Sequence, residues 1–121
     1  MPWEYKVSTG VLSKDNVQQP YKGYSGKGVG KDRPAMEASS NIGPIPAGNY
    51  TIGASYKHPT KGPEVMKLAP VGHNAHGRTN FLIHGDSKAH PGKASEGCIV
   101  LGQSARKAIA NSHDTQLVVL P

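Results

Sequence analysis

The chain has 121 residues, and its 14 Lys and Arg against 8 Asp and Glu give a formal net charge of +6. Val, Ile, Leu and Phe together number only 22, whereas Gly and Pro number 15 and 10. This composition excludes a thick helical bundle and leaves a disordered basic chain or a small, turn-rich, mostly β domain. No apolar run approaches the roughly 18 residues of a membrane span, and a single cysteine excludes an internal disulfide.

The local order of residues favours a folded β domain. Residues 3–7 alternate apolar and polar side chains, as a half-buried strand does, and Gly10 then permits a turn into a second strand that begins at Val11. Further strands are predicted over residues 49–56, 64–69, 81–83 and 98–101, and the apolar run 117–120 is typical of a buried central strand. Strands at this spacing predict a single domain over residues 1–121, a β-sandwich or partly closed barrel.

One short helix is predicted at about residues 104–111. Residues 105–110 are rich in helix-forming side chains, and Ser104 can serve as the N-cap. The Gly-rich stretch 22–31 carries lysines that could hold a phosphate, but it lacks the Gly-Lys-Ser/Thr ending of a P-loop. We therefore interpret it as a loop.

Two residues suggest thiol chemistry. Cys98 follows a glycine at the start of an apolar run, and His84 ends an apolar run fourteen residues upstream. Two short strands joined by a loop can lie side by side and bring the two side chains together, so that His84 takes the proton of the Cys98 thiol. From residue type alone, a buried and inert Cys98 is the more frequent alternative.

The other histidines and the basic charge give two further hypotheses. His73, His76, His84 and His90, with Asp86 among them, could form a zinc site, although their flanking residues indicate exposed turns. The two halves of the chain carry equal charge, seven basic and four acidic residues each. This even spread indicates a solvated surface and not a nucleic-acid stripe, although it would help the protein approach an anionic polymer such as a bacterial envelope component. A zinc hydrolase and a non-catalytic wall-binding module therefore stay open.

Three ordered motifs are similar to the L,D-transpeptidase catalytic domain, and most similar to the small L,D-transpeptidase effectors of type VI secretion. The resemblance extends roughly from Trp3 to Val119 and rests on Gly23-Tyr24-Ser25-Gly26, on Asn41-Ile42-Gly43-Pro44-Ile45-Pro46, and on His84-Gly85-Asp86-Ser87 with Ser95-x-Gly97-Cys98. It implies a peptidoglycan-modifying enzyme without a cofactor. The substrates would be tetrapeptide stems, whose terminal D-alanine is removed by water (L,D-carboxypeptidase) or exchanged for another D-amino acid.

The resemblance also implies roles for four residues. Cys98 would attack the carbonyl of the third stem residue, and His84 would be its base. Ser95 or a neighbouring carbonyl would orient the imidazole, and the backbone amides of Gly97 and Cys98 would stabilise the oxyanion.

Five further residues are candidates for substrate contact. Arg78 would pair with a substrate carboxylate, because a planar guanidinium suits bidentate binding; a solvent-facing Arg78 is the alternative. Gly85, Asp86 and Ser87 follow the histidine, and Glu96 replaces the histidine of the usual Ser-His-Gly-Cys. This departure, together with a valine after Cys-Ile where the family often has arginine, puts cross-linking of two stems in doubt.

Location and partners follow from the same resemblance. The chain opens Met-Pro-Trp-Glu-Tyr-Lys, with no basic-then-apolar leader. We therefore expect secretion without a signal peptide and action in the periplasm of a target cell. A cognate immunity protein would be a partner, whereas nucleic acid and membrane insertion are not expected.

Overall fold

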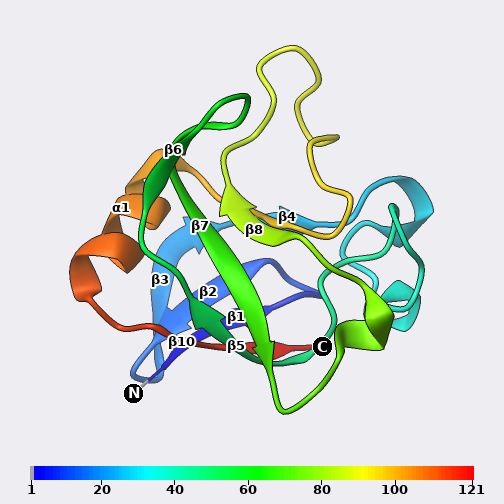
Figure 1. Ribbon diagram of the computed structural model, residues 1–121, viewed down its shortest axis with the longest axis horizontal. Helices are drawn as coiled ribbons and strands as arrows, with labels where there is room; N and C mark the ends of the chain where they lie inside the picture. Colours follow the sequence, from blue (N-terminus) through cyan, green and yellow to red (C-terminus); the bar gives the residue numbers. More distant parts are fainter. Residues whose placement is uncertain (1) are drawn as a thin grey trace.

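The alternating segment at the start of the chain forms the first strand of the computed structural model, which describes residues 2–121 (Figure 1). Ten strands are present among these residues: β1 (Trp3–Lys6), β2 (Val11–Lys14), β3 (Val17–Lys22), β4 (Tyr24–Ser25), β5 (Gly48–Ile52), β6 (Tyr56–His58), β7 (Gly62–Val71), β8 (Phe81–His84), β9 (Ile99–Val100) and β10 (Gln116–Leu120). The same residues contain one α-helix, α1 (Gln103–Ser112), and three 3-10 turns, which cover Gly28–Gly30, Pro34–Met36 and Ala75–Gly77.

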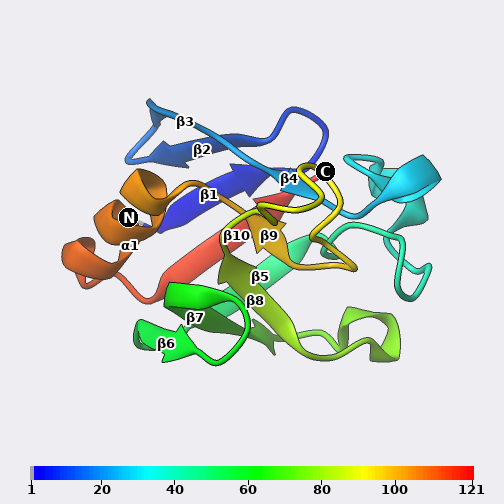
Figure 2. The same cartoon turned by 90° about the horizontal axis from the view of Figure 1, so that it is seen from above.

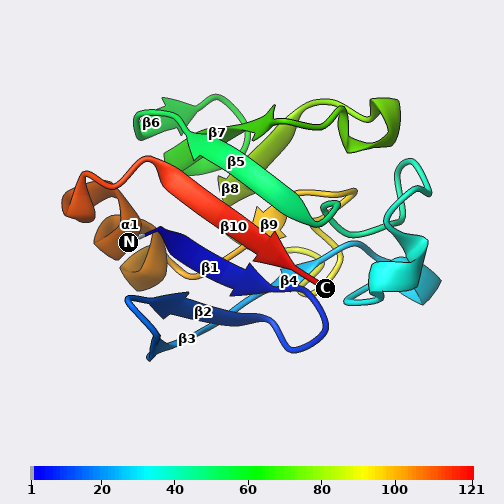
Figure 3. The same cartoon turned by 90° about the horizontal axis from the view of Figure 1, so that it is seen from below.

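The strands form one mixed sheet in the order β3-β2-β1-β10-β5-β7-β8-β9-β4, with β6 paired to β7 outside this path. The pairs β1–β10 and β8–β9 are parallel, and the other pairs are antiparallel. The two ends of the order, β3 and β4, are separated by Gly23 alone, so the sheet curls back toward its own start without being a fully bonded barrel. Figure 3 shows β10 crossing the middle of the sheet between β1 and β5. The prediction of a mostly β, partly closed architecture is confirmed.

The core lies on the inner face of the curled sheet. Alternate residues of β1 and β10 point into it: Trp3, Tyr5, Leu117 and Val119 are each at most 3% exposed. The predicted central position of the last strand is confirmed, but its burial is one-sided, since Leu120 is 37% exposed. The strand therefore follows the period of two expected of a sheet with one solvated face.

The helix is confirmed with corrected ends. It begins at Gln103, one residue before the predicted start, and Gly102 is its N-cap, with no side-chain hydrogen bond. The prediction of Ser104 as N-cap is wrong, because Gly102 already has extended backbone and its carbonyl accepts the first helical hydrogen bond, from Arg106 N at 3.1 Å. His113 ends the helix in the left-handed conformation.

Two parts of the sheet differ from the prediction. The expected strand 49–56 is divided into β5 and β6, because residues 53–55 leave the ladder between them. Strand β3 falls in a polar stretch that was not predicted as a strand, since Gln18, Gln19 and Pro20 carry no apolar alternation and β3 is the exposed edge of the sheet. The Gly-rich stretch 22–31 is mostly turn, although it contains the short strand β4.

Two connections project from the same side of the sheet. The turn between β6 and β7 and the long loop between β8 and β9 both rise at the top of Figure 1, and Figure 2 shows them from above. Together with the start of α1 they surround the end of β8. Within residues 2–121, no helix is both long and apolar enough to cross a bilayer.

Candidate active site

Neighbouring parallel strands bring His84 and Cys98 to one side of the sheet. Strand β8 pairs with β9 so that Ile83 lies opposite Ile99 and His84 opposite Val100. Because side chains alternate along a strand, Cys98, which directly precedes β9, is on the same face as Val100 and His84. The predicted side-by-side placement of these two segments is confirmed.

The imidazole of His84 is buried and held in one tautomer. Its side chain is 1% exposed, and Nδ1 lies 2.7 Å from the carbonyl oxygen of Gly85. A carbonyl can only accept, so Nδ1 carries the proton and Nε2 keeps its lone pair. Burial lowers the pKa of His84, against the opposing effect of the Gly85 hydrogen bond. His84 is therefore neutral at pH 7, and its buried Nε2 has no hydrogen-bond partner.

Cys98 directly precedes β9, on the face of the sheet that carries His84, and its side chain is a neutral thiol. Burial raises the pKa of Cys98, although the backbone of Leu82 and the positive charge of Lys61 act in the other direction. Its Sγ is 3.7 Å from the carbonyl oxygen of Asn80, a residue in the left-handed conformation just before β8. Nε2 of His84 has no hydrogen-bond partner among residues 2–121, so the two side chains do not form a resting thiolate–imidazolium pair.

Ser95 organises the loop that carries the cysteine. Its hydroxyl accepts hydrogen bonds from the backbone N–H of Gly26 at 2.9 Å and of Gly97 at 3.2 Å, and it donates to the carbonyl of Cys98 at 2.6 Å. Ser95 therefore does not orient His84. The carbonyl of Gly85 does, which is the second of the two alternatives expected from the sequence. The N–H of Gly97, expected in the oxyanion hole, is already bonded to Ser95.

Arg78 has a different role from the one expected. Its side chain is buried, Nη1 donates to the carbonyls of Glu37 and Pro44 at 2.6 and 2.7 Å, and Nη2 donates to those of Gly43 and Glu96 at 3.0 Å each. Both terminal nitrogens are thus engaged by the main chain, so Arg78 is neither solvent-facing nor free for a substrate carboxylate. It holds the Glu96–Gly97 backbone, and a Cβ on Gly97 would lie only 2.4 Å from Nη2.

A second buried arginine supports the histidine side. Arg106, on α1, donates to the carbonyls of Leu101, Glu64 and Pro63 at 2.6, 3.2 and 3.3 Å. Gly85 packs against it, since a Cβ there would lie 2.7 Å from Nη1. The expected site residue Gly85 thus supplies the carbonyl that orients His84, at a position where only glycine fits against the guanidinium.

Asp86 and Ser87 shape the loop after the histidine. The Asp86 carboxylate accepts hydrogen bonds from the Tyr24 hydroxyl at 2.6 Å and from the N–H groups of Ser87 and Gly92. Burial alone would raise the pKa of Asp86, but these hydrogen bonds outweigh it and hold the pKa below its usual value. The Ser87 hydroxyl accepts from His90 N at 3.0 Å.

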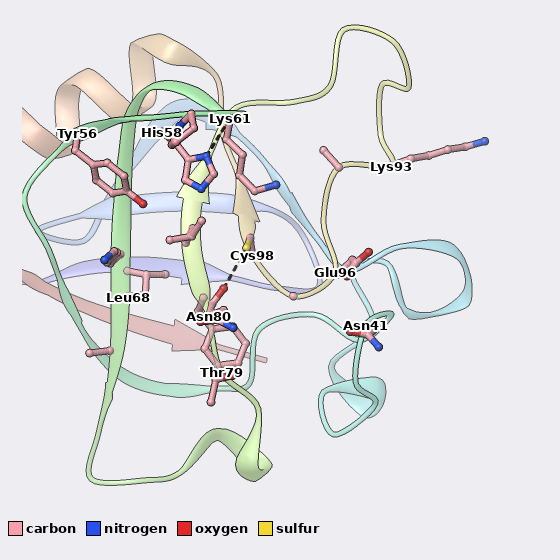
Figure 4. Close-up of a pocket in the computed structure, with 17 residues that line it drawn as sticks. Asn41, Tyr56, His58, Lys61, Leu68, Thr79, Asn80, Lys93, Glu96 and Cys98 are labelled. Atoms are coloured by element: carbon pink, nitrogen blue, oxygen red, sulfur yellow. Dashed lines mark hydrogen bonds between the residues drawn. The ribbon is translucent and has the colours of Figure 1, made fainter.

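Two hollows meet at the catalytic candidates. One, of about 970 Å³, is lined by Cys98, Asn80, Glu96 and the β6–β7 turn, and the other, of about 980 Å³, is lined by His84, residues 85–90 and the start of α1. They share Lys61, Lys93 and Ala94. Figure 4 shows His58 and Lys61 directed toward the space beside Cys98, whereas Lys93 points away. Neither Lys61 nor His58 stands out in the sequence, because only the pairing of β6 with β7 places their turn beside the cysteine.

The remaining histidines do not converge. His73 contacts the carbonyl of Asn49, and His76 pairs with Glu37 at 2.7 Å, both away from His84. Among residues 2–121, no group of three or more His, Cys, Asp or Glu side chains could hold a metal ion. The zinc hypothesis therefore lacks its ligand cluster in the described part of the chain.

The curled β-sheet sets the segment that carries Cys98 beside the strand that ends in the buried, singly protonated His84, and cysteine acyl-transfer enzymes use a pair of side chains of these two types. The sequence profile of the Tlde1 domain matches residues 19–121, and the chain therefore belongs to the Tlde1 family, the L,D-transpeptidase effectors of type VI secretion. At the family level this implies an L,D-transpeptidase-like activity on peptidoglycan and secretion into target cells. A comparison with curated proteins gives no match.

Proposed function

We propose that the protein releases or exchanges the terminal D-alanine of peptidoglycan tetrapeptide stems through a thioester on Cys98. The observation that carries this proposal is the neutral His84, whose buried Nε2 lone pair has no partner and lies on the same side of the sheet as the cysteine. A base in this state is ready to accept a thiol proton, and it is oriented by Gly85 before substrate arrives.

In the first half-reaction, the Cys98 sulfur forms a bond to the carbonyl carbon of the third stem residue while the thiol proton passes to His84 Nε2. The tetrahedral intermediate then collapses, the C–N bond to D-alanine breaks, and the proton on Nε2 passes to the departing amine. The products are free D-alanine, a thioester and a neutral imidazole. Because the resting thiol is protonated, this proton transfer accompanies the attack.

In the second half-reaction, water or the amine of another D-amino acid attacks the thioester. His84 removes the proton of the attacking group, the C–S bond breaks, and the proton returns to the sulfur. Water yields a tripeptide stem, and a D-amino acid yields an exchanged tetrapeptide. No cofactor takes part. The protein would act in the periplasm of the target cell, where a cognate immunity protein would block it.

The test is incubation of the protein with purified tetrapeptide muropeptides, followed by mass spectrometry of the muropeptides and of the intact protein. We expect tripeptide or exchanged products and an acyl adduct on Cys98. C98A should lose the adduct and all products with little change in melting temperature. H84A should lose at least about a thousandfold in kcat/KM, and because it removes a buried side chain and its hydrogen bond it is assayed well below its own melting temperature.

Three other outcomes would contradict the proposal. A C98A variant that still forms product would remove the thiol from the reaction. Loss of activity on adding a chelator would point to a metal hydrolase. Retention on sacculi without any product or adduct would leave only wall binding.

A further inference from the structure

The turn between β6 and β7 holds a histidine in the opposite tautomer from His84. Nδ1 of His58 accepts hydrogen bonds from the backbone N–H groups of Thr60 and Lys61, both at 3.1 Å. A nitrogen that accepts two such bonds carries no proton, so the proton of the neutral ring is on Nε2. His58 therefore offers an Nε2–H donor, whereas His84 offers an Nε2 lone pair.

Lys61 adds a positive charge beside this donor. It lines both hollows, the one with Cys98 and the one with His84, and its charge lowers the pKa of both side chains. No ion pair joins its ammonium to an acidic side chain of residues 2–121. In Figure 4 the Lys61 and His58 side chains are directed toward the region of the Cys98 sulfur.

The other charged side chains of this hollow are engaged elsewhere or directed away. Glu96 pairs with Lys27 at 3.3 Å, the ammonium of Lys67 lies 5.8 Å from the centre of the Tyr56 ring, and Lys93 extends outward (Figure 4). Lys61 and His58 thus face the region of the Cys98 sulfur, and the acidic side chain that also acts on Cys98, Glu96, is paired with Lys27.

We propose that His58 Nε2–H and the Lys61 ammonium bind the terminal carboxylate of the stem, that of the D-alanine that leaves. This inference rests on the proposed function, which places the third-residue carbonyl at Cys98 Sγ. The D-alanine carboxylate is one residue beyond that carbonyl, and one residue spans at most about 3.6 Å. A carboxylate forms its strongest hydrogen bonds with charged and N–H donors, and this pair supplies one of each.

The proposal has a consequence for specificity. A stem whose fourth residue ends in a free carboxylate gains the two contacts, whereas a stem extended or capped at that position leaves the donors unpaired. The protein would therefore act at the free end of a stem and not inside a longer peptide.

The test compares two soluble substrates, a stem tetrapeptide with a free terminal carboxylate and the same peptide as its terminal carboxamide. We expect the wild-type protein to prefer the acid by at least about tenfold in kcat/KM. In K61Q the preference should fall to about twofold or less, because the acid loses the carboxylate contact in addition to the effect of the Lys61 charge on the reacting groups, which both substrates share. H58F should lose part of the preference and K61R should regain most of it. K57Q, on the neighbouring strand β6, is the matched control and should keep the wild-type ratio.

The outcomes separate this inference from the proposed function. Equal cleavage of acid and amide by the wild-type protein, or an unchanged ratio in K61Q, would overturn the carboxylate site while leaving the Cys98 chemistry intact. Equal losses in K61Q and K57Q would overturn it too, since the effect would then be general charge. If the wild-type protein cleaves neither peptide and forms no adduct, the proposed function fails and the inference with it. Circular dichroism melts of each variant show whether a lost activity reflects unfolding.

Discussion

The two sides of the candidate site are supported in the same manner but by different parts of the fold. On the cysteine side, Arg78 lies against Gly97, and on the histidine side Arg106 lies against Gly85. Arg78 gathers carbonyls from residues 37–44 and from residue 96, all in irregular backbone. Arg106 instead bonds carbonyls at the ends of regular elements, around α1, β7 and β9.

This difference indicates that the cysteine side depends on one residue, Arg78, more than the histidine side depends on Arg106. The elements around His84 are also held by the β7–β8 and β8–β9 ladders, whereas the segment of residues 26–47 has few ladder bonds and is tied to the cysteine loop by Arg78 and Ser95. We therefore expect substitutions on the cysteine side to lower the stability of the fold more than those on the histidine side. The following predictions run from the largest expected effect to the smallest.

The largest effect is expected from removing the two guanidinium groups. R78M leaves four buried carbonyls without their charged donor and should lower the free energy of unfolding by about 4 kcal/mol. R106M removes three hydrogen bonds, two of them at 3.2–3.3 Å, and should cost about 2 kcal/mol. Urea unfolding measures both, and R33M, at an exposed arginine, should change stability by less than about 0.5 kcal/mol. Equal losses in R78M and R106M would contradict the proposed asymmetry.

The adjoining glycines should show the same order. Gly97 has φ +140° and its Cβ would approach Arg78 to 2.4 Å, so G97A combines backbone strain with a clash. Gly85 has no such φ, and its Cβ would meet Arg106 at 2.7 Å. We expect G97A to cost about 3 kcal/mol and G85A about 1–2 kcal/mol. G53A, where a Cβ would make only ordinary contacts with Lys67 at 3.4–3.7 Å and no positive φ is needed, is the control for thermal melts.

The resting state of the catalytic pair makes thiol labelling informative. Since the pKa of Cys98 is raised by burial, the rate of iodoacetamide labelling should be low at pH 7 and rise toward higher pH than for a free cysteine. H84A should label at nearly the wild-type rate while losing peptide cleavage, because His84 is neutral and has no hydrogen bond to the sulfur. A large drop in labelling in H84A would mean that a thiolate–imidazolium pair already exists without substrate.

The smallest effect is expected at the loop after the histidine. The folded-state pKa of Asp86 is depressed, so its contribution to stability is present above the unfolded pKa and is lost as the pH falls through the folded value. D86N should therefore lower Tm by about 1–3 °C at pH 6. The difference from the wild-type protein should vanish near pH 2. A difference that grows on acidification would contradict this assignment.

Much of the fold was predictable because it depends on local patterns. Alternation identified β1, apolar runs identified β8, β9 and β10, and Gly10 (φ +72°) identified the first turn. The edge strand β3 was not predictable, since its side chains meet solvent and its backbone needs only β2 as a partner. The N-cap at Gly102 was missed because backbone geometry, and not a side chain, starts the helix there.

The site was predictable as a set of residues and less so as a set of contacts. The sequence predicted that His84 and Cys98 lie on neighbouring segments, because each is at the end of a short apolar run, and such runs are a local signal. The buried partners of Arg78, the bond of Ser95 to Gly26 and the placement of His58 and Lys61 beside Cys98 all depend on segments between 18 and 69 residues apart. No pattern within one segment encodes such contacts, so the expected substrate role of Arg78 could not be tested before the fold was known.

The central position of β10 has a consequence for the rate of folding. Residues 116–120 separate β1 from β5 in the sheet and pair with both, so Trp3 lies opposite Leu117, far away along the chain. The two halves of the sheet can join only after this distant pairing has formed. Because the entropy of closing so long a loop is lost before the contacts form, we expect slow folding for a domain of this size.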